Sequence, residues 1–156
     1  SVTTFHAGEA YNVIPAQAEI TGTVRTLKRE VSKSAEERIR TICNGIAALF
    51  GVTVDLAYNT NYPVTFNHPD ETEFAGNVAA DIAGEEQVDR SLPPAMGGED
   101  FSYMLEARPG AFIFMGNGDS EYLHHPAYDF NDEAIPYGVS YWIKLTESAL
   151  PAKAGT

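Results

Sequence analysis

The residues SAEERIRTICNGIAALFG at positions 34–51 decide how the first part of the chain folds. Apolar residues recur there every three or four positions, which predicts an amphipathic helix. Ser34 and Glu37 have the spacing of a capping box at its start, and Gly51 stands where a left-handed C-terminal cap is expected. Cys43 falls inside the apolar stripe, so we interpret it as a small buried hydrophobic residue.

Strand signals surround this helix. Residues 2–5 are mostly β-branched and residues 18–27 alternate apolar and polar side chains, which predicts an antiparallel hairpin. Residues 52–58 alternate again and predict a third strand. The order strand, strand, helix, strand is that of a ferredoxin-like, split βαβ unit without its first strand and helix. Together with a strand that begins at the first residues, this order suggests a fragment of a larger fold.

Helix and loop signals alternate in the second part of the chain. The stretch at 59–69 contains proline and asparagine, which favour turns, and it predicts a boundary. Three helices are expected at about 70–84, from MGGEDF (96–101) to Leu105, and from Pro136 onward, with a buried strand at 111–115. We therefore predict a mixed α/β (α+β) chain with a small lobe at 1–63 and a second part at 64–156.

Composition and charge exclude several classes of protein. Hydrophobic residues make up 44% of the chain and charged residues 21%, and no apolar run approaches the roughly 20 residues that cross a bilayer. The 10 basic and 22 acidic residues give a net charge of −12, which repels nucleic acids and anionic membranes. A single cysteine excludes an intrachain disulfide and fits a reducing compartment. We expect a cytoplasmic protein that binds neither nucleic acid nor membrane.

The stretch LHHPAYDFND at 123–132 carries the residues best suited to bind a metal ion. Adjacent histidines in a loop point in roughly opposite directions, so one metal centre would use one of the pair. A neutral imidazole is a common ligand of zinc-like ions, and α/β folds bind ligands just beyond a buried strand. The alternative is an ordinary surface histidine. Asp129 and Asp132 could orient the ligand or cap the next helix, and the cap is the simpler interpretation of Asp132.

Two glycines and two polar residues are candidates for binding a substrate. Gly97 and Gly98 precede a predicted helix, where backbone N–H groups favour an anion, although a simple turn explains them equally well. Asn12 and Arg25 would converge on one face of the predicted hairpin and hold a carboxylate; otherwise Arg25 is a solvated charge. The GNGDS loop at 116–120 lacks the lysine and the spacing of nucleotide-binding motifs, which argues against phosphate binding.

Three separated stretches carry a resemblance to a known family. They are HAGEAYNVIPAQAEITGTVRTL at 6–27, MGGEDF at 96–101 and LHHPAYDFNDEAIPYG at 123–138. In this order they resemble the metal-dependent amidohydrolases of the aminoacylase type, above all the hippurate hydrolases and indole-acetyl-amino-acid hydrolases. The resemblance implies the C-terminal part of such an enzyme. Residues 1–63 would be part of a satellite domain used for lid closure and dimerisation, and residues 64–156 part of an α/β zinc-peptidase-like catalytic domain.

The same resemblance implies roles for individual residues. His124 matches the family's last metal ligand, whereas His125 stands at a position that varies. Asn12 and Arg25 match satellite residues that contact the substrate's carboxylate or the scissile carbonyl, and Gly98 matches the position whose backbone N–H binds that carboxylate. The other metal ligands, the general base and a histidine that stabilises the oxyanion would lie in sequence outside this chain.

The activity that the resemblance implies is hydrolysis of the amide bond of N-acyl amino acids or small peptides by a metal-activated water, with zinc or manganese as the ion. One histidine cannot hold a catalytic ion, which takes about three protein ligands, so we expect this chain alone to be inactive and metal-poor. The intact protein is expected to be a homo-oligomer whose lid closes about residues 59–67. The alternatives are a non-catalytic binding or dimerisation module derived from the same fold and a plain α/β domain that binds no metal.

Overall fold

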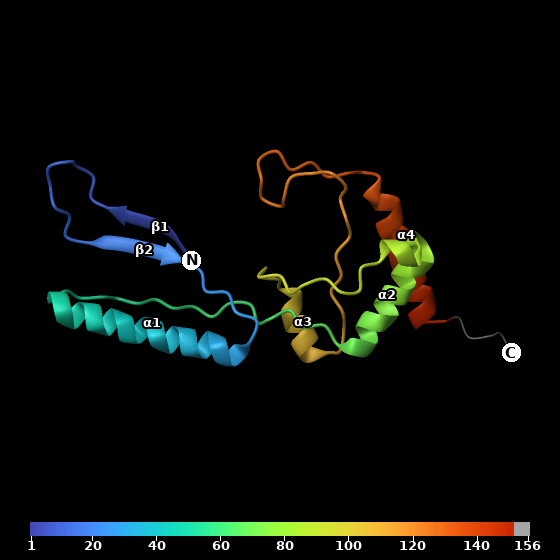
Figure 1. Ribbon diagram of the computed structural model, residues 1–156, viewed down its shortest axis with the longest axis horizontal. Helices are drawn as coiled ribbons and strands as arrows, with labels where there is room; N and C mark the ends of the chain where they lie inside the picture. Colours follow the sequence, from blue (N-terminus) through green and yellow to red (C-terminus); the bar gives the residue numbers. More distant parts are fainter. Residues whose placement is uncertain (152–156) are drawn as a thin grey trace. The chain divides into compact units, whose positions relative to one another are not determined.

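The computed structural model of the protein describes residues 1–151 (Figure 1). In chain order its elements are β1 (Val2–Ala7), β2 (Ala18–Gly22), α1 (Arg29–Phe50), α2 (Pro69–Ala83), the short 3-10 helix η1 (Glu85–Gln87), α3 (Phe101–Ala107) and α4 (Ala134–Ala149). They fall into two compact units, the first made of Ser1–Val64 with Pro94–Glu99 and the second of the remaining described residues. The fold is mixed α+β, as the sequence predicts.

The first unit contains the predicted hairpin. β1 and β2 pair antiparallel, with Phe5 opposite Ile20. At the open end of the hairpin, the Ser1 amino group donates to the Thr23 carbonyl (2.8 Å) and the Thr23 N–H donates to the Ser1 carbonyl (2.9 Å). β2 ends at Gly22, so it is shorter than the predicted strand at 18–27. Its pairing stops there because β1 extends no further along it.

Helix α1 confirms the predicted amphipathic segment but begins earlier than expected. Gly51 adopts the left-handed conformation (φ 65°, ψ 30°) and its N–H donates to the Ala47 carbonyl, as predicted for the C-terminal cap. The predicted capping box is wrong, because the helix begins at Arg29 and Ser34 lies more than one turn inside it. The residues at 29–33 include neither proline nor glycine, so nothing prevents the helix from extending upstream.

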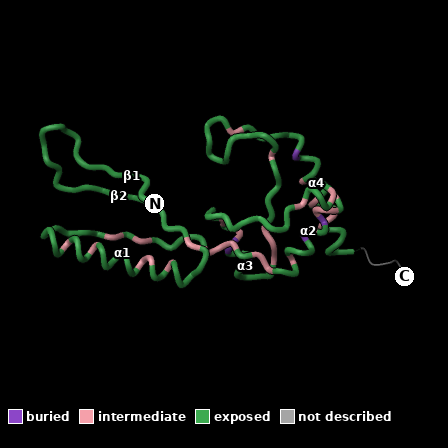
Figure 2. The backbone as a smooth tube through the Cα atoms, viewed as in Figure 1, coloured by how far each residue is buried: buried purple, intermediate pink, exposed green. Residues whose placement is uncertain are grey.

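The apolar stripe of α1 is present but not buried. No residue of α1 is buried, and α1 packs on none of the other described helices and strands. Figure 2 shows this helix as exposed or intermediate along its whole length. Ile42 and Ile46 remain 61% and 43% exposed. Cys43 is half-exposed, so its interpretation as a buried residue is wrong, because no neighbouring element covers the stripe.

Two predicted strands do not form. Within residues 1–151 the β1–β2 hairpin is the only sheet, and no strand is present at 52–58 or 111–115. A strand requires a neighbour that completes its backbone hydrogen bonds, and neither segment has a strand partner in this part of the chain. At Phe112 the side chain of Asn67 takes that place, since its Nδ2 donates to the Phe112 carbonyl and its Oδ1 accepts the Phe112 N–H, both at 2.8 Å. Residues 113–115 are exposed, so the prediction of a buried strand is wrong.

The second unit holds a small core between its helices. α2 begins at Pro69 and ends before Gly84, and α3 ends before Pro109, close to the predicted bounds. α4 begins at Ala134, two residues before the predicted start, and packs against α2. The buried residues, purple in Figure 2, are Ala75, Val78, Ser102, Leu105 and Ala134. Among the described helices, none has the length and apolar character needed to span a membrane.

Candidate active-site residues

Arg25 and Gly98 meet within the first unit. Arg25 follows β2. Gly98 belongs to the segment Pro94–Glu99, which joins this unit although it begins 30 residues further along the chain than Val64. A Cβ atom added to Gly98 would overlap the Nη1 atom of Arg25 and would lie 3.3 Å from its Cζ. The guanidinium therefore lies against the Gly98 backbone, on the side where any other residue would place its side chain.

The ring of Tyr62 lies beside the same glycine. Its Cδ2 atom is 3.4 Å from the position that a Cβ atom on Gly98 would take, whereas the corresponding space at Gly97 is open. Neither glycine has a positive φ, so the Arg25 guanidinium, and not the backbone conformation, distinguishes position 98 from position 97. Tyr62 was not predicted as a site residue, because a tyrosine next to Pro63 in a boundary stretch carries no sign of a contact with residue 98.

A guanidinium beside a glycine backbone is suited to hold a carboxylate. Arg25 presents its N–H donors in a planar fork that matches two carboxylate oxygens, and glycine lets an anion approach the backbone closely. Both residues are exposed, so the pair remains accessible. The structure thus brings together two of the residues that the sequence analysis nominated for substrate binding.

Asn12 lies apart from this pair. It belongs to the loop that joins β1 to β2, whereas Arg25 follows the other end of β2 (Figure 1). The ladder between them rises about 3.4 Å per residue, so the loop and the open end of the hairpin are separated by the length of β2. The expectation that Asn12 and Arg25 converge on one face is wrong, because an antiparallel hairpin keeps its loop and its open end at opposite ends.

The histidine loop belongs to the second unit, and its two histidines differ. His124 has a φ of 70° and is the only non-glycine residue with a positive φ in residues 1–151. Its side chain is exposed. The Nδ1 atom of His125 accepts the backbone N–H of Ala127 (3.1 Å), so this ring is engaged within the loop. The geometry leaves His124 as the better ligand candidate of the two.

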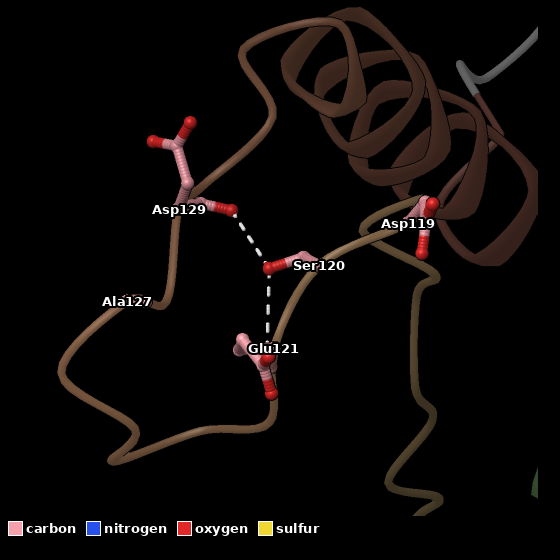
Figure 3. A pocket seen from close by; sticks show the side chains of 5 residues that line it. All are labelled: Asp119, Ser120, Glu121, Ala127 and Asp129. Carbon is pink, nitrogen blue, oxygen red and sulfur yellow. Dashed lines mark hydrogen bonds between the residues drawn. The ribbon is translucent and has the colours of Figure 1, made fainter.

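Asn117 closes the base of the histidine loop, a role that the sequence analysis missed. Its Nδ2 donates to the Asp129 carbonyl (2.7 Å) and its Oδ1 accepts the Asn131 N–H (2.8 Å). The Ser120 hydroxyl donates to the same Asp129 carbonyl (3.1 Å), as Figure 3 shows. The signal in the sequence was Asn-Gly at 117–118, which is typical of a turn and says nothing about its distant partners.

Asp132 does not cap α4 with its side chain. The residue before the helix is Glu133, and its N–H donates to the Oδ1 atom of Asn131 (3.0 Å). Asp132 contributes its backbone carbonyl, which accepts the N–H of Ile135 (3.1 Å). The predicted cap is therefore wrong, because no side chain caps α4 and the nearest side-chain bond joins Asn131 to the residue before the helix.

An open depression of about 470 Å³ lies beside this loop, lined by Asp119, Ser120, Glu121, Ala127 and Asp129 (Figure 3). Its three carboxylates do not converge in Figure 3. Within residues 1–151, no group of three or more His, Cys, Asp or Glu side chains could hold a metal ion. A catalytic ion takes about three protein ligands. The described residues can supply one of them, His124, but do not form a complete metal site.

The fold is mixed α+β, and the sequence is that of a peptidase family. Residues 4–148 match the sequence pattern of peptidase family M20/M25/M40, and the chain belongs to this family.

Several relatives indicate how much of a family member the chain represents. It is 37% identical over 145 residues to a hippurate hydrolase of Campylobacter jejuni and 36% identical over 145 residues to an N-acetylcysteine deacetylase of Bacillus subtilis. Each alignment covers 93% of this chain but only 38% and 37% of the relative, respectively. The crystal structure of Bacillus subtilis YXEP, described as a dinuclear metal binding peptidase from the M20 family, matches with a TM-score of 0.77 and 35% identity over 97% of this chain and 42% of that one.

Proposed function

We propose that this chain is part of a metal-dependent amidohydrolase that cleaves the amide bond of N-acyl amino acids or related small peptides. The Arg25 guanidinium against the Gly98 backbone carries the proposal, since this pair suits the free carboxylate of such substrates. Family membership and the names of the hippurate hydrolase and deacetylase relatives support it.

The residues of this chain bind and orient the substrate. Arg25 and the N–H of Gly98 hold the carboxylate, and this contact fixes the position of the amide bond relative to the reacting groups. The ring of Tyr62 lies beside Gly98 and forms one side of this place. Asn12 lies at the other end of the hairpin from Arg25, so we do not assign it to the same bound substrate.

His124 is the metal ligand that we assign to this chain. The ion is divalent, zinc or manganese, and the dinuclear metal binding described for YXEP supports a divalent metal. When bound, such an ion polarises the amide carbonyl and activates a water molecule. The remaining ligands and the general base would come from the part of the relatives that this chain does not span.

We assign residues 1–63 to a satellite domain and residues 64–156 to a catalytic domain of a cytoplasmic homo-oligomer. The division into compact units supports a boundary near Val64, with Pro94–Glu99 joined to the first unit. Because the chain passes between the units near residues 64, 93 and 99, closure of the lid bends it at three points and not within 59–67 alone.

Substitution of Arg25 in the full-length protein tests the proposed function. The assay compares an N-acyl amino acid, N-benzoylglycine, with its carboxamide analogue, which lacks the carboxylate. Arg25→Lys keeps the charge and removes the planar fork, and Arg25→Ala removes both. We expect kcat/KM for the acid to fall at least about tenfold in R25K and further in R25A, with little change for the carboxamide.

The matched control is Arg38→Ala, which removes an exposed arginine from α1 and should leave both rates unchanged. Equal losses on the acid and the carboxamide would contradict the assigned role of Arg25, as would a loss of stability with unchanged kinetics. The ligand role of His124 is tested separately by metal analysis, in which His124→Ala should lose bound Zn²⁺ or Mn²⁺.

A further inference from the structure

The side chain of Asn117 joins the two ends of the histidine loop. One amide donates to Asp129 and accepts from Asn131, which are 12 and 14 positions further along the chain. Both bonds are short, at 2.7 and 2.8 Å, and Asn117 is half-buried. Closing such a loop restricts the conformations of every residue inside it, because the ends can no longer move independently.

The closed base is anchored to the packed part of the second unit. Asn131 receives the bond from Glu133, the residue before α4. Ala134, the first residue of α4, is 8% exposed, and α4 packs against α2. A rigid connection therefore runs from Asn117 through Asn131 to the core.

Within the closed loop, His125 supports the turn and His124 protrudes from it. The His125 N–H donates to the Tyr122 carbonyl (3.0 Å) and the His125 carbonyl accepts the Tyr128 N–H (2.9 Å). These bonds fix the chain on both sides of His124, whose φ of 70° lies in a region that side chains larger than glycine rarely adopt. Such a conformation persists where the surroundings impose it.

We propose that Asn117 is a positioning residue for His124. By closing the base of the loop, its amide holds His124 in the left-handed conformation and sets the direction in which the imidazole leaves the loop. The inference rests on the proposed ligand role of His124, and it assigns to the half-buried asparagine a task distinct from that of the metal ligands.

Asn117→Asp in the full-length protein tests the proposal. The substitution replaces the Nδ2 donor by an oxygen that faces the Asp129 carbonyl, while an acceptor for Asn131 remains. The protein is stripped with a chelator and titrated with Zn²⁺ by calorimetry. We expect the Kd for Zn²⁺ to rise about tenfold, as for other residues that orient a metal ligand.

Asn67→Asp is the matched control. Asn67 makes the same pair of amide bonds to Phe112, with both distances at 2.8 Å, and it is also half-buried in the second unit. Both variants should lose thermal stability to a similar degree, and only N117D should weaken Zn²⁺ binding. An unchanged Kd in N117D, or an equal rise in both variants, overturns the positioning role.

Two more variants separate the possible failures. His124→Ala tests the ligand itself: unchanged Zn²⁺ affinity there overturns the proposed function of His124 and the inference with it. Lost affinity in H124A with unchanged affinity in N117D overturns the positioning role alone. Should N117D not fold, Ser120→Ala replaces it, because the lost hydroxyl bonds the Asp129 carbonyl at the base of the loop as well as the neighbouring Glu121 carbonyl. The Kd for Zn²⁺ is then expected to rise about two- to threefold, because an exposed hydrogen bond contributes little to holding the loop. An unchanged Kd overturns the proposal.

Discussion

Gly98→Ala places a methyl group where the Arg25 guanidinium now lies. The added Cβ atom would overlap Nη1 of Arg25, while Cζ at 3.3 Å and the Tyr62 ring at 3.4 Å are close but tolerable neighbours. Nη1 is the far end of a flexible, exposed side chain, so Arg25 can rotate away at little cost. We expect the free energy of unfolding to change by no more than about 0.5 kcal/mol.

The effect of Gly98→Ala on catalysis should be much larger than its effect on stability. Moving the guanidinium removes a charge-assisted contact worth about 1.5–3 kcal/mol to the substrate carboxylate. That loss corresponds to about a 10- to 150-fold decrease in kcat/KM. The assay is steady-state hydrolysis of N-benzoylglycine and of its carboxamide by the full-length protein. The decrease should appear with the acid and be absent with the carboxamide.

Gly97→Ala is the control, because the space beside Gly97 is open and its φ is not positive. G97A should behave as the unsubstituted protein with both substrates. The reasoning would be refuted by similar losses in G97A and G98A, since the crowding by Arg25 exists only at position 98. It would also be refuted if G98A kept its full activity on the acid.

Three further predictions concern stability and can be measured by denaturation of the full-length protein. Gly45→Ala in α1 meets open space and should stabilise by about 1 kcal/mol, whereas Gly76→Ala in α2 would overlap Nη1 of Arg90 and should stabilise less or not at all; equal gains would contradict this. His124→Asn should raise the free energy of unfolding by up to about 1 kcal/mol while weakening metal binding, because asparagine tolerates a positive φ better; a less stable variant would contradict the strain at this residue. The hydrogen bond from Arg90 holds the pKa of Glu85 below its ordinary value of 4.5. The stabilisation that this pair gives the folded protein is therefore present above pH 4.5 and lost as the pH falls through the lowered pKa. The Tm difference between the unsubstituted protein and Glu85→Gln should therefore shrink as the pH falls below 4.5, and a difference that stays constant as the pH falls would contradict the pairing.

Local chain signals predicted the elements that depend on neighbours close in sequence. The hairpin formed because alternation and the turn residues between its strands act over about twenty positions. Gly51 capped α1 because only the last turn of the helix decides that conformation. The prediction of a capping box at Ser34 was wrong, because a serine three residues before a glutamate also occurs inside a long helix and does not by itself mark the start.

The candidate site was predictable by residue type and less so by arrangement. Arg25 and Gly98 were nominated independently, and the structure brings them together across more than 70 residues of chain. Asn12 carried an equally strong signal but lies at the other end of the hairpin, because the register of a hairpin depends on its turn and not on the polar residues it carries. Asn117 showed only a turn signal, since its hydrogen-bond partners lie beyond the loop that it closes.

The failed predictions for α1, 52–58 and 111–115 share one physical cause. Each of three sequence patterns indicates which surroundings a segment is suited to, and not which surroundings it has. They are the apolar stripe on α1, the alternation at 52–58 and the apolar run at 111–115. In this chain no described element packs on α1, and neither extended segment has a strand partner. Asn67 is an example, because its amide supplies to Phe112 the donor and acceptor that a neighbouring strand would otherwise provide. A side-chain pattern thus predicts which faces of a segment are fit for burial, while hydrogen bonding and packing decide whether burial takes place.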